Sequence, residues 1–468
     1  MLFRLLVLET SRILRAKSAG PSNNWSASIC IFIDRNKPTC VDGGGNKRCL
    51  IFFIKLILAL YLIFFVFALA LSNPVANELG KTVGLLAVEN PAELGFDPVK
   101  LDNVFKVQKK LISDKHAPSN VGLVVRRGKV VYHRAASSSM PHDRIISDNT
   151  VFPIWSMTKP ITSVAAMILY ERGKFKLDDP VSNVLPEMAA VKVRTKDGEL
   201  APLAKSITYR DLFRHTAGFN GYEGLYHEDG FWAKTTQAKS LTVIIRELAK
   251  KPMEHQPSAK YTYGMSTAVL GRAVEVLSGK SFNKFLRKEI FKPLKMENTR
   301  FYLTKSTRKS FQPLSVFEDG NYRAGKPEED ELPYEKDSSL YLGGEGLVST
   351  LLDYARFCQM LVNGGSAPGG EKILKADTLK LMWKDQIGNI PGYDDQKNGN
   401  GFGLGFYVLN DFNKFGAEGV FGWGGYHTTH FWIDPKNELY AIFMCRRYPY
   451  NGETLKQFRK AVYESLIR

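Results

Sequence analysis

Cysteine is scarce in this chain, and the few cysteines are unevenly placed. Only five occur among 468 residues, and three of them precede residue 50. The other two, Cys358 and Cys445, lie in a helical and a strand-like pattern, and no Cys/His cluster has the spacing of metal ligands. We therefore expect two buried thiols, with neither a disulfide framework nor a metal site.

Nucleic-acid binding motifs are also missing, although the chain is basic. The formal net charge is +17 and the pI is near 9.4, yet no long basic run carries interleaved aromatic residues. The charge instead indicates a basic soluble surface, or attraction to anionic membranes and wall polymers. The sequence has no internal repeat and no low-complexity segment, and nothing in it implies a metal or an organic cofactor.

A Gly-x-Ser-x-Gly nucleophile elbow, which a Ser-His-Asp hydrolase of the α/β type requires, is absent as well. The nearest match runs from Gly264 to Ala268, lacks the last glycine and lies inside a helical pattern. We therefore exclude this class of hydrolase.

The first 93 residues predict export rather than catalysis. Residues 1–49 show no sustained periodicity, so we expect a disordered extension. Residues 50–72 form an apolar run that is long enough to span a bilayer, and two basic residues before it favour a cytoplasmic N-terminal side. Ala-Leu-Ala at 68–70 resembles a signal-peptidase site. A cleaved signal peptide and an uncleaved membrane anchor both remain open, and either places the catalytic body in the periplasm or outside the cell. Residues 73–93 are expected to be a linker.

Residues 94–468 are expected to form the catalytic domain. Hairpin patterns enclosed by helices indicate an α+β fold, an antiparallel sheet flanked by helices. Residues from about 174 to 330 have the pattern of helices and loops, so we expect a mostly helical insertion there. The expected helices are 94–113, 156–173, 208–218, 261–279, 351–361 and 455–467, and the expected strands are 120–133 (a hairpin), 401–408, 419–434 and 439–445.

The candidate nucleophile is Ser156, three residues before Lys159 on one helix face. Such a pair also occurs on surface helices, but apolar flanks that include Ile154 and Trp155 indicate a buried site. A desolvated lysine can accept the serine proton, and the positive end of the helix favours an anionic nucleophile. Pro160 agrees with a helix that has just begun, since proline is tolerated only in the first turn.

Two further residues, Tyr263 and His215, could have either a catalytic or a structural role. Tyr263 sits at the start of an expected helix and is either a packed aromatic residue or a phenol aimed at the Ser156 hydroxyl. His215 lies at the end of a helix capped by Thr208. It could be a base, but a histidine that hydrogen-bonds a loop is favoured at this position.

Taken in order, these segments resemble the serine β-lactamase and penicillin-binding-protein superfamily, in the class C-like branch closest to the family VIII carboxylesterases. The segment from Ser156 to Lys159 is similar to the family's nucleophile box. Residues 208–218 are similar to its arginine-aspartate-leucine helix, and residues 343–353 to its glycine-rich turn. The resemblance covers the chain from about residue 94 to its end. It implies a serine β-lactamase-like fold and no cofactor.

Two boxes depart from the β-lactamase pattern. The family's tyrosine-x-asparagine is Tyr263-Gly264-Met265 here, so an apolar residue replaces a polar partner of the β-lactam amide. The lysine-threonine-glycine box aligns with residues 423–425, which read Trp-Gly-Gly as in family VIII esterases. The resemblance therefore implies a substrate-binding wall without a cation, which suits an ester that carries no carboxylate. These substrate-binding residues are Met265, Trp423, Gly424 and Gly425.

The implied reaction is acyl transfer through Ser156. Lys159 and Tyr263 would share the base role, and the backbone N–H groups of Ser156 and Tyr426 would form the oxyanion hole. His427 and His430 on the same strand are expected to be structural. The expected partner is a small ester or a β-lactam-like molecule, with the membrane as a second partner if residues 50–72 stay attached.

Two alternatives stay open beside the esterase. One is a β-lactamase or D-alanyl-D-alanine carboxypeptidase, which export would suit. The other is a non-catalytic, wall-associated binding protein that kept the fold.

Overall fold

The computed structural model describes residues 29–31, 39–41, 86–87, 90–220, 238, 240–330, 332, 334–336, 339–409, 416 and 418–467. It divides into two compact units, 1–73 and 74–468. In the first unit, β1 (Ile29–Ile31) pairs antiparallel with β2 (Thr39–Val41). The apolar segment 50–72 lies outside the described residues, and so do residues 73–85 and 88–89 of the expected linker. Among the residues that are described, none of the helices has the length and apolarity that a bilayer crossing requires.

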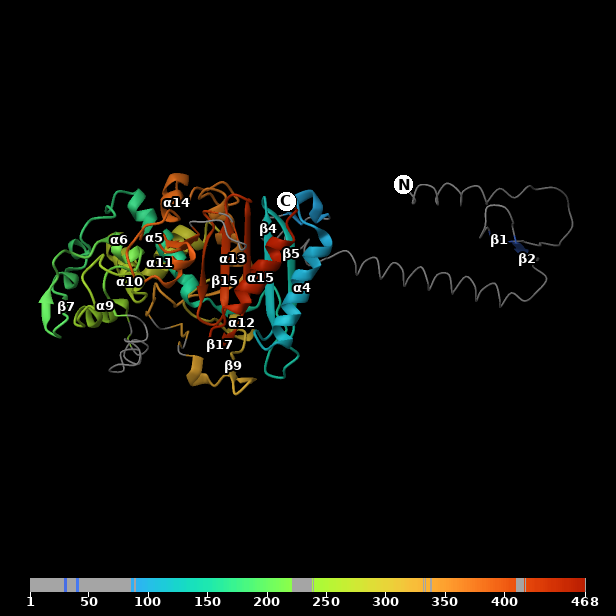
Figure 1. Cartoon of the computed structure of the whole chain (residues 1–468), viewed down its shortest axis with the longest axis horizontal. Coiled ribbons are helices and arrows are strands. Elements are labelled where there is room, and N and C mark those ends of the chain that lie inside the picture. Colours follow the sequence, from blue (N-terminus) through green and yellow to red (C-terminus); the bar gives the residue numbers. More distant parts are fainter. Residues whose placement is uncertain are drawn as a thin grey trace. The chain divides into compact units, whose positions relative to one another are not determined.

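The second unit is built on an eight-stranded sheet in the order β12-β13-β14-β15-β16-β4-β5-β3 (Figure 1). Neighbouring strands are antiparallel except at one edge, where β3 (Leu86–Ala87) runs parallel to β5. This confirms the predicted α+β class. The other strands of this sheet are β4 (Asn120–Arg126), β5 (Lys129–Ala136), β12 (Asn400–Phe402), β13 (Tyr407–Leu409), β14 (Phe421–Gly425), β15 (Thr429–Asp434) and β16 (Leu439–Cys445).

The central strands β15 and β16 are buried along their whole length because helices cover both faces of the sheet. Successive side chains of a strand point to opposite faces. Trp432 and Phe443 therefore pack under α4 (Pro98–Ser113) and α15 (Glu453–Glu464), which lie side by side in Figure 1. Their neighbours Phe431 and Ile442 pack on the other face, against α5 (Thr158–Glu171) and α13 (Leu351–Val362).

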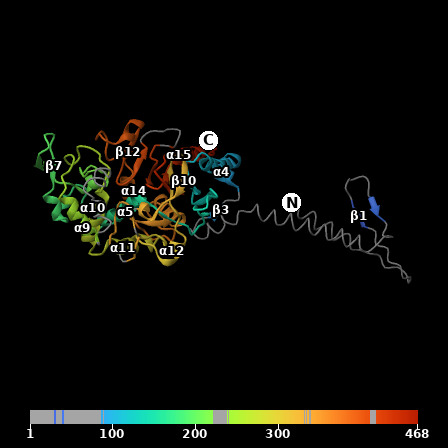
Figure 2. The same cartoon turned by 90° about the horizontal axis from the view of Figure 1, so that it is seen from below.

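Most remaining helices lie at the end of the unit away from α4 and α15, as Figure 1 shows for α6, α9 and α10 and Figure 2 for α9 and α10. The insertion predicted at about 174–330 is less helical than expected, because it also holds two hairpins of short strands, β7–β8 and β9–β10. The other α-helices described in the unit are α6 (Tyr209–Phe213), α9 (Leu241–Ala249), α10 (Ser266–Ser278), α11 (Phe282–Leu286), α12 (Lys305–Lys309) and α14 (Ala376–Met382). The short strands outside the main sheet are β6 (Val151–Pro153), β7 (Lys192–Arg194), β8 (Leu200–Pro202), β9 (Ser315–Glu318), β10 (Asn321–Ala324), β11 (Val348–Thr350) and β17 (Arg447–Tyr448).

Several predicted elements differ from the structure, and three of them do so for reasons that can be identified. The helix expected from residue 94 begins at Pro98, because the Asp97 side chain accepts the Val99 N–H at 2.9 Å and caps it there. The helix expected over 208–218 keeps its Thr208 cap but ends at Phe213. The strand expected over 401–408 is the hairpin β12–β13, whose turn includes Gly405 with φ +95°.

Candidate active site

The nucleophile candidate sits where a short strand enters a helix. Ser156 belongs to a single 3-10 turn, η2 (Trp155–Met157), that leads directly into α5. Trp155 adopts φ +45°, which is rare for a residue with a side chain, and its indole N–H donates to His427 Nδ1 at 2.9 Å. This bond anchors the turn to the end of β14 and gives His427 a structural task.

The structure brings Ser156, Lys159 and Tyr263 together. Lys159 Nζ donates to Ser156 Oγ at 3.1 Å, and the Tyr263 hydroxyl donates to the same oxygen at 2.7 Å. The ammonium lies 4.7 Å from the centre of the Tyr263 ring. The Lys159 side chain is almost completely buried, at 1% exposure, as its apolar flanks predicted. Because Ser156 Oγ is hydrogen-bonded to both an amine and a phenol, it can exchange its proton with either group.

Glu345 is a neighbour of this centre that the sequence analysis did not single out. Its carboxylate oxygen Oε2 lies 4.0 Å from Lys159 Nζ, and the same ammonium donates to the Gly344 carbonyl at 2.9 Å. Both residues belong to the glycine-rich turn, which passes so close to α10 that a Cβ on Gly343 would meet the Thr267 carbonyl at 2.6 Å. The sequence held one signal that could have identified Glu345: it is the only charged residue in the segment 338–352.

The ring of His215 packs against the ring of Tyr263. The two rings are 4.9 Å apart, and the His215 carbonyl accepts the Thr262 N–H at 2.8 Å. Complete burial, together with the nearby Lys159 charge, holds the pKa of His215 well below its usual value, so the ring is neutral. A structural role was favoured for His215, but the bond to the loop is made by its backbone carbonyl, and its ring Nδ1 has no hydrogen-bond partner among the described residues.

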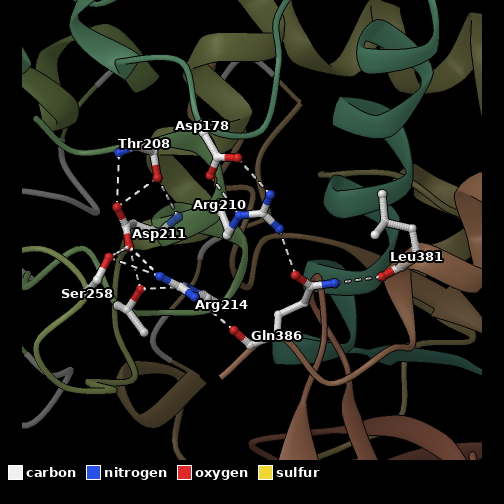
Figure 3. A network of polar contacts seen from close by, with 9 residues as sticks. Asp178, Thr208, Arg210, Asp211, Arg214, Ser258, Leu381 and Gln386 are labelled. Atoms are coloured by element: carbon white, nitrogen blue, oxygen red, sulfur yellow. Dashed lines mark hydrogen bonds and ion pairs between the residues drawn. The ribbon is translucent and has the colours of Figure 1, made fainter. Parts of the chain in front are cut away.

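A polar network fixes the segment that carries His215 (Figure 3). Asp211 accepts hydrogen bonds from Ser258 at 2.6 Å and from Thr216 at 2.7 Å, and Arg214 donates to the Gln386 carbonyl at 2.8 Å. Burial acts to raise the pKa of Asp211, but these hydroxyl bonds and those of the helix cap outweigh it and lower the pKa. The ionised carboxylate thus ties the end of α6 to the loop before Tyr263.

The predicted third box lies on β14 beside the nucleophile. Trp423 tilts over the Tyr263 ring at 5.6 Å between centroids. A Cβ on Gly425 would meet the Ile154 carbonyl at 2.5 Å, whereas one on Gly424 would first meet the Thr429 carbonyl at 3.4 Å. Gly425 therefore lets the strand pass directly against the segment that ends in Ser156.

The strand expected over 419–434 is interrupted by a turn at residues 426–428. Tyr426 lies in the turn between β14 and β15, where Thr428 has φ +69°, and its ring meets Trp155 edge-on at 5.3 Å. His430 is buried in β15 against Phe443, and burial lowers its pKa to about 3. Burial also holds the pKa of His427 below its ordinary value.

A cavity of about 410 Å³ opens at Ser156, within the usual size range of small-molecule sites. Its wall is largely aromatic, but it includes Arg459, so the wall is not free of cations as the resemblance implied. Met265 is not part of this wall: its side chain is fully buried in the core where α10 begins, which corrects its predicted contact with substrate. The lining residues are Ser156, Tyr263, Tyr393, Asn400, Tyr407, Leu409, Trp423, Gly424, Gly425, Tyr426, Tyr450, Leu455 and Arg459.

Among the described parts of the chain, no group of three or more His, Cys, Asp or Glu residues is arranged to hold a metal ion. Cys358 and Cys445 are free and buried, which confirms the prediction for the two thiols.

Comparison with known proteins agrees with the geometry. The family model described as Beta-lactamase matches residues 102–463. The chain is 26% identical to a lovastatin esterase of Penicillium rubens (67% of this chain, 84% of the relative) and 24% identical to a putative D-alanyl-D-alanine carboxypeptidase of Escherichia coli K12 (81% and 90%). A similar solved structure is that of EstCE1, a hydrolase with promiscuous acyltransferase activity, with a TM-score of 0.64, 24% identity and coverage of 78% of this chain and 98% of that one. The family match spans most of the sequence, and this chain belongs to the beta-lactamase family.

Proposed function

We propose that the protein is a serine hydrolase that cleaves or transfers esters through an acyl-enzyme on Ser156. The observation that carries the proposal is the pair of hydrogen bonds that Lys159 and Tyr263 make to Ser156 Oγ at the mouth of an aromatic cavity. The similarity to a lovastatin esterase supports an ester as the substrate.

The first half of the proposed reaction forms the acyl-enzyme. When the Lys159–Tyr263 pair has given up one proton, Ser156 Oγ attacks the ester carbonyl carbon and passes its own proton to the pair. The backbone N–H groups of Ser156 and Tyr426 stabilise the resulting oxyanion. The C–O bond of the ester then breaks, and Tyr263 returns the proton to the leaving alcohol.

The second half releases the acyl group. Water, or another alcohol, attacks the acyl carbonyl and gives its proton to the same pair, and Ser156 leaves with a proton regained from it. Hydrolysis and transesterification differ only in which of these nucleophiles reaches the cavity.

A D-alanyl-D-alanine carboxypeptidase is the second candidate. It is favoured by the similarity to a relative described in those words. The methionine in the second box and the tryptophan in the third speak against it and against a β-lactamase, because the first replaces an asparagine that binds the amide and the second replaces a cation that binds the carboxylate.

The deciding experiment compares short p-nitrophenyl esters with a chromogenic cephalosporin, using the body from residue 73 in wild-type and Ser156→Ala forms. Ester turnover that disappears in the variant, with little cephalosporin opening, is the expected result. Faster cephalosporin opening than ester turnover would favour the second candidate. No Ser156-dependent activity on either would favour a non-catalytic binding protein.

We also propose that the body is exported, with residues 50–72 as signal or anchor. Fractionation of cells that express the chain with a C-terminal tag should place the tag outside the cytoplasm. Mass spectrometry of the mature N-terminus then separates a cleaved signal from a retained anchor.

A further inference from the structure

The carboxylate of Glu345 is buried beside the Lys159 ammonium. Its Oε2 lies 4.0 Å from Nζ, and the two side chains are 4% and 1% exposed. Water and salt screen two charges in such a place only weakly, so each one strongly influences the protonation of the other. The protonation of Lys159 is part of the proposed reaction. Glu345 therefore influences the chemistry of the site as well as its stability.

Helix α5 binds the glycine-rich turn on both sides of Glu345. Ahead of this residue, Thr162 Oγ1 donates to the Gly343 carbonyl at 2.6 Å. After it, the Leu347 N–H donates to Thr158 Oγ1 at 3.2 Å. The two threonines are one helical turn apart, and the catalytic lysine lies between them in the sequence. The helix that carries the lysine thus also fixes the carboxylate beside it.

Other titratable groups face Lys159 from the elements packed around it, and they are neutral. Tyr263, ahead of α10, donates its hydroxyl proton to the nucleophile. His215, after α6, is neutral because burial and the Lys159 charge hold its pKa well below the usual value. Helix α13 presents Tyr354 to the start of α5, and burial raises the pKa of this phenol well above its ordinary value. Glu345 is therefore the charged group that balances Lys159.

We propose that Glu345 is a positioning residue that sets the pH at which the Lys159–Tyr263 pair gives up its activating proton. This rests on the proposed function, in which the pair loses one proton to the solvent before Ser156 attacks. A carboxylate beside the ammonium stabilises the fully protonated pair, so the proton leaves only at higher pH. The remaining pair is then a stronger base for the Ser156 proton than it would be without Glu345.

The acid limb of the kcat/KM profile tests this, because it reports the proton that the free enzyme must lose. Opposite charges at the observed distance shift such a limb by roughly one to three pH units, depending on how strongly water screens them. Glu345→Gln should move the limb to lower pH by about this amount. Its maximal kcat/KM should fall, because its pair is a weaker base. The assay follows a short p-nitrophenyl ester at the isosbestic wavelength of p-nitrophenol across the pH range.

Three further variants separate the effect of the charge from a structural defect. Glu345→Ala removes the carboxylate without placing an amide beside the ammonium, and it should shift the limb as Glu345→Gln does. Glu345→Asp keeps the charge, so its limb should lie closer to that of wild type. Glu438→Gln removes the same charge from an exposed ion pair with Arg127 and should leave the limb in place. A limb that coincides with that of wild type in both neutral variants at position 345 would overturn the proposal, whatever the maximal rate.

A measurement without substrate separates this inference from the esterase function. In protein labelled with 13C at the tyrosine Cζ, the resonance that Tyr263→Phe removes reports the titration of the coupled pair. It should change at lower pH in Glu345→Gln than in wild type. Such a shift in a protein that turns over no ester would reject the esterase function and support the role of Glu345, whereas identical titrations would overturn that role. Thermal unfolding of each variant, recorded beforehand, identifies a variant that has lost its fold.

Discussion

A single methyl group on Gly425 should separate the strand β14 from the nucleophile. In the structure a Cβ at this position would lie 2.5 Å from the Ile154 carbonyl, and it would also collide with Thr429. An ordinary contact begins at 3.4 Å, so strand and turn must part by about 0.9 Å. The Thr429 hydroxyl belongs to a side chain that can rotate, but the Ile154 carbonyl is backbone and cannot rotate away.

The consequence can be given a size. A displacement near 1 Å in a catalytic arrangement costs on the order of 100-fold in rate. Gly425→Ala should therefore lower kcat/KM for a short p-nitrophenyl ester by about 100-fold, and overpacking should reduce the unfolding free energy by about 1–3 kcal/mol. Steady-state kinetics and urea unfolding measure the two effects.

Gly424→Ala is the matched comparison on the same strand. Its new Cβ would first meet the Thr429 carbonyl at 3.4 Å, which is an ordinary contact, so its unfolding free energy should stay within about 0.5 kcal/mol of wild type. The reasoning fails if Gly425→Ala folds and turns over ester as fast as Gly424→Ala does.

Three further predictions concern the groups around Ser156. Tyr263→Phe removes the 2.7 Å bond to Ser156 Oγ and should lower kcat by roughly 10²- to 10⁴-fold with little change in KM, as measured in steady state. Glu345→Gln removes one partner of a buried charge pair and should lower the unfolding free energy by about 3 kcal/mol in urea titrations. Burial lowers the pKa values of His215, His427 and His430, so below about pH 6.5 the unfolded chain binds protons that the folded chain does not. The unfolding free energy should therefore decrease as the pH is lowered from 7 to 5, by up to about 1.4 kcal/mol per pH unit for each of these histidines. Urea titrations at a series of pH values measure this decrease.

Each of these has a result that would contradict it. A Tyr263→Phe enzyme with wild-type kcat would remove the phenol from the proton path. Unchanged stability of Glu345→Gln would mean that the carboxylate does not balance the Lys159 charge. Equal stability at pH 7 and pH 5 would mean that the buried histidines can be protonated in the folded protein.

The nucleophile region was predictable because its signals are local. Ser156 and Lys159 are three residues apart on one segment, so their meeting depends only on helix geometry and on apolar flanks. The sheet was predictable for a similar reason, since hairpins pair strands that are neighbours in sequence.

The residues that were missed reach the site through tertiary packing. Arg459 lies on an amphipathic C-terminal helix, where the sequence pattern does not say which residue at the border of the apolar face meets a cavity. Glu345 approaches Lys159 only because the glycine-rich turn packs closely on α10. Met265 was placed by motif alignment, which fixes the order of residues but not the direction of a side chain at a helix start.

The ends of short helices were also not predictable from the sequence, because tertiary contacts decide them. Thr208 correctly predicted where α6 begins, but not that it ends after Phe213, because the chain then follows tertiary bonds such as those of Asp211 to Ser258. Hydrogen bonds between segments far apart in the sequence overrode the local helical pattern there.

The central claim is a covalent acyl-enzyme on Ser156, and rapid-quench mass spectrometry tests it most directly. Wild-type protein mixed with a p-nitrophenyl ester should gain the mass of one acyl group within the burst phase. Fragmentation should place that mass on Ser156, and Ser156→Ala should gain none. Ester turnover without an adduct, or an adduct on another residue with full activity in Ser156→Ala, would contradict the account.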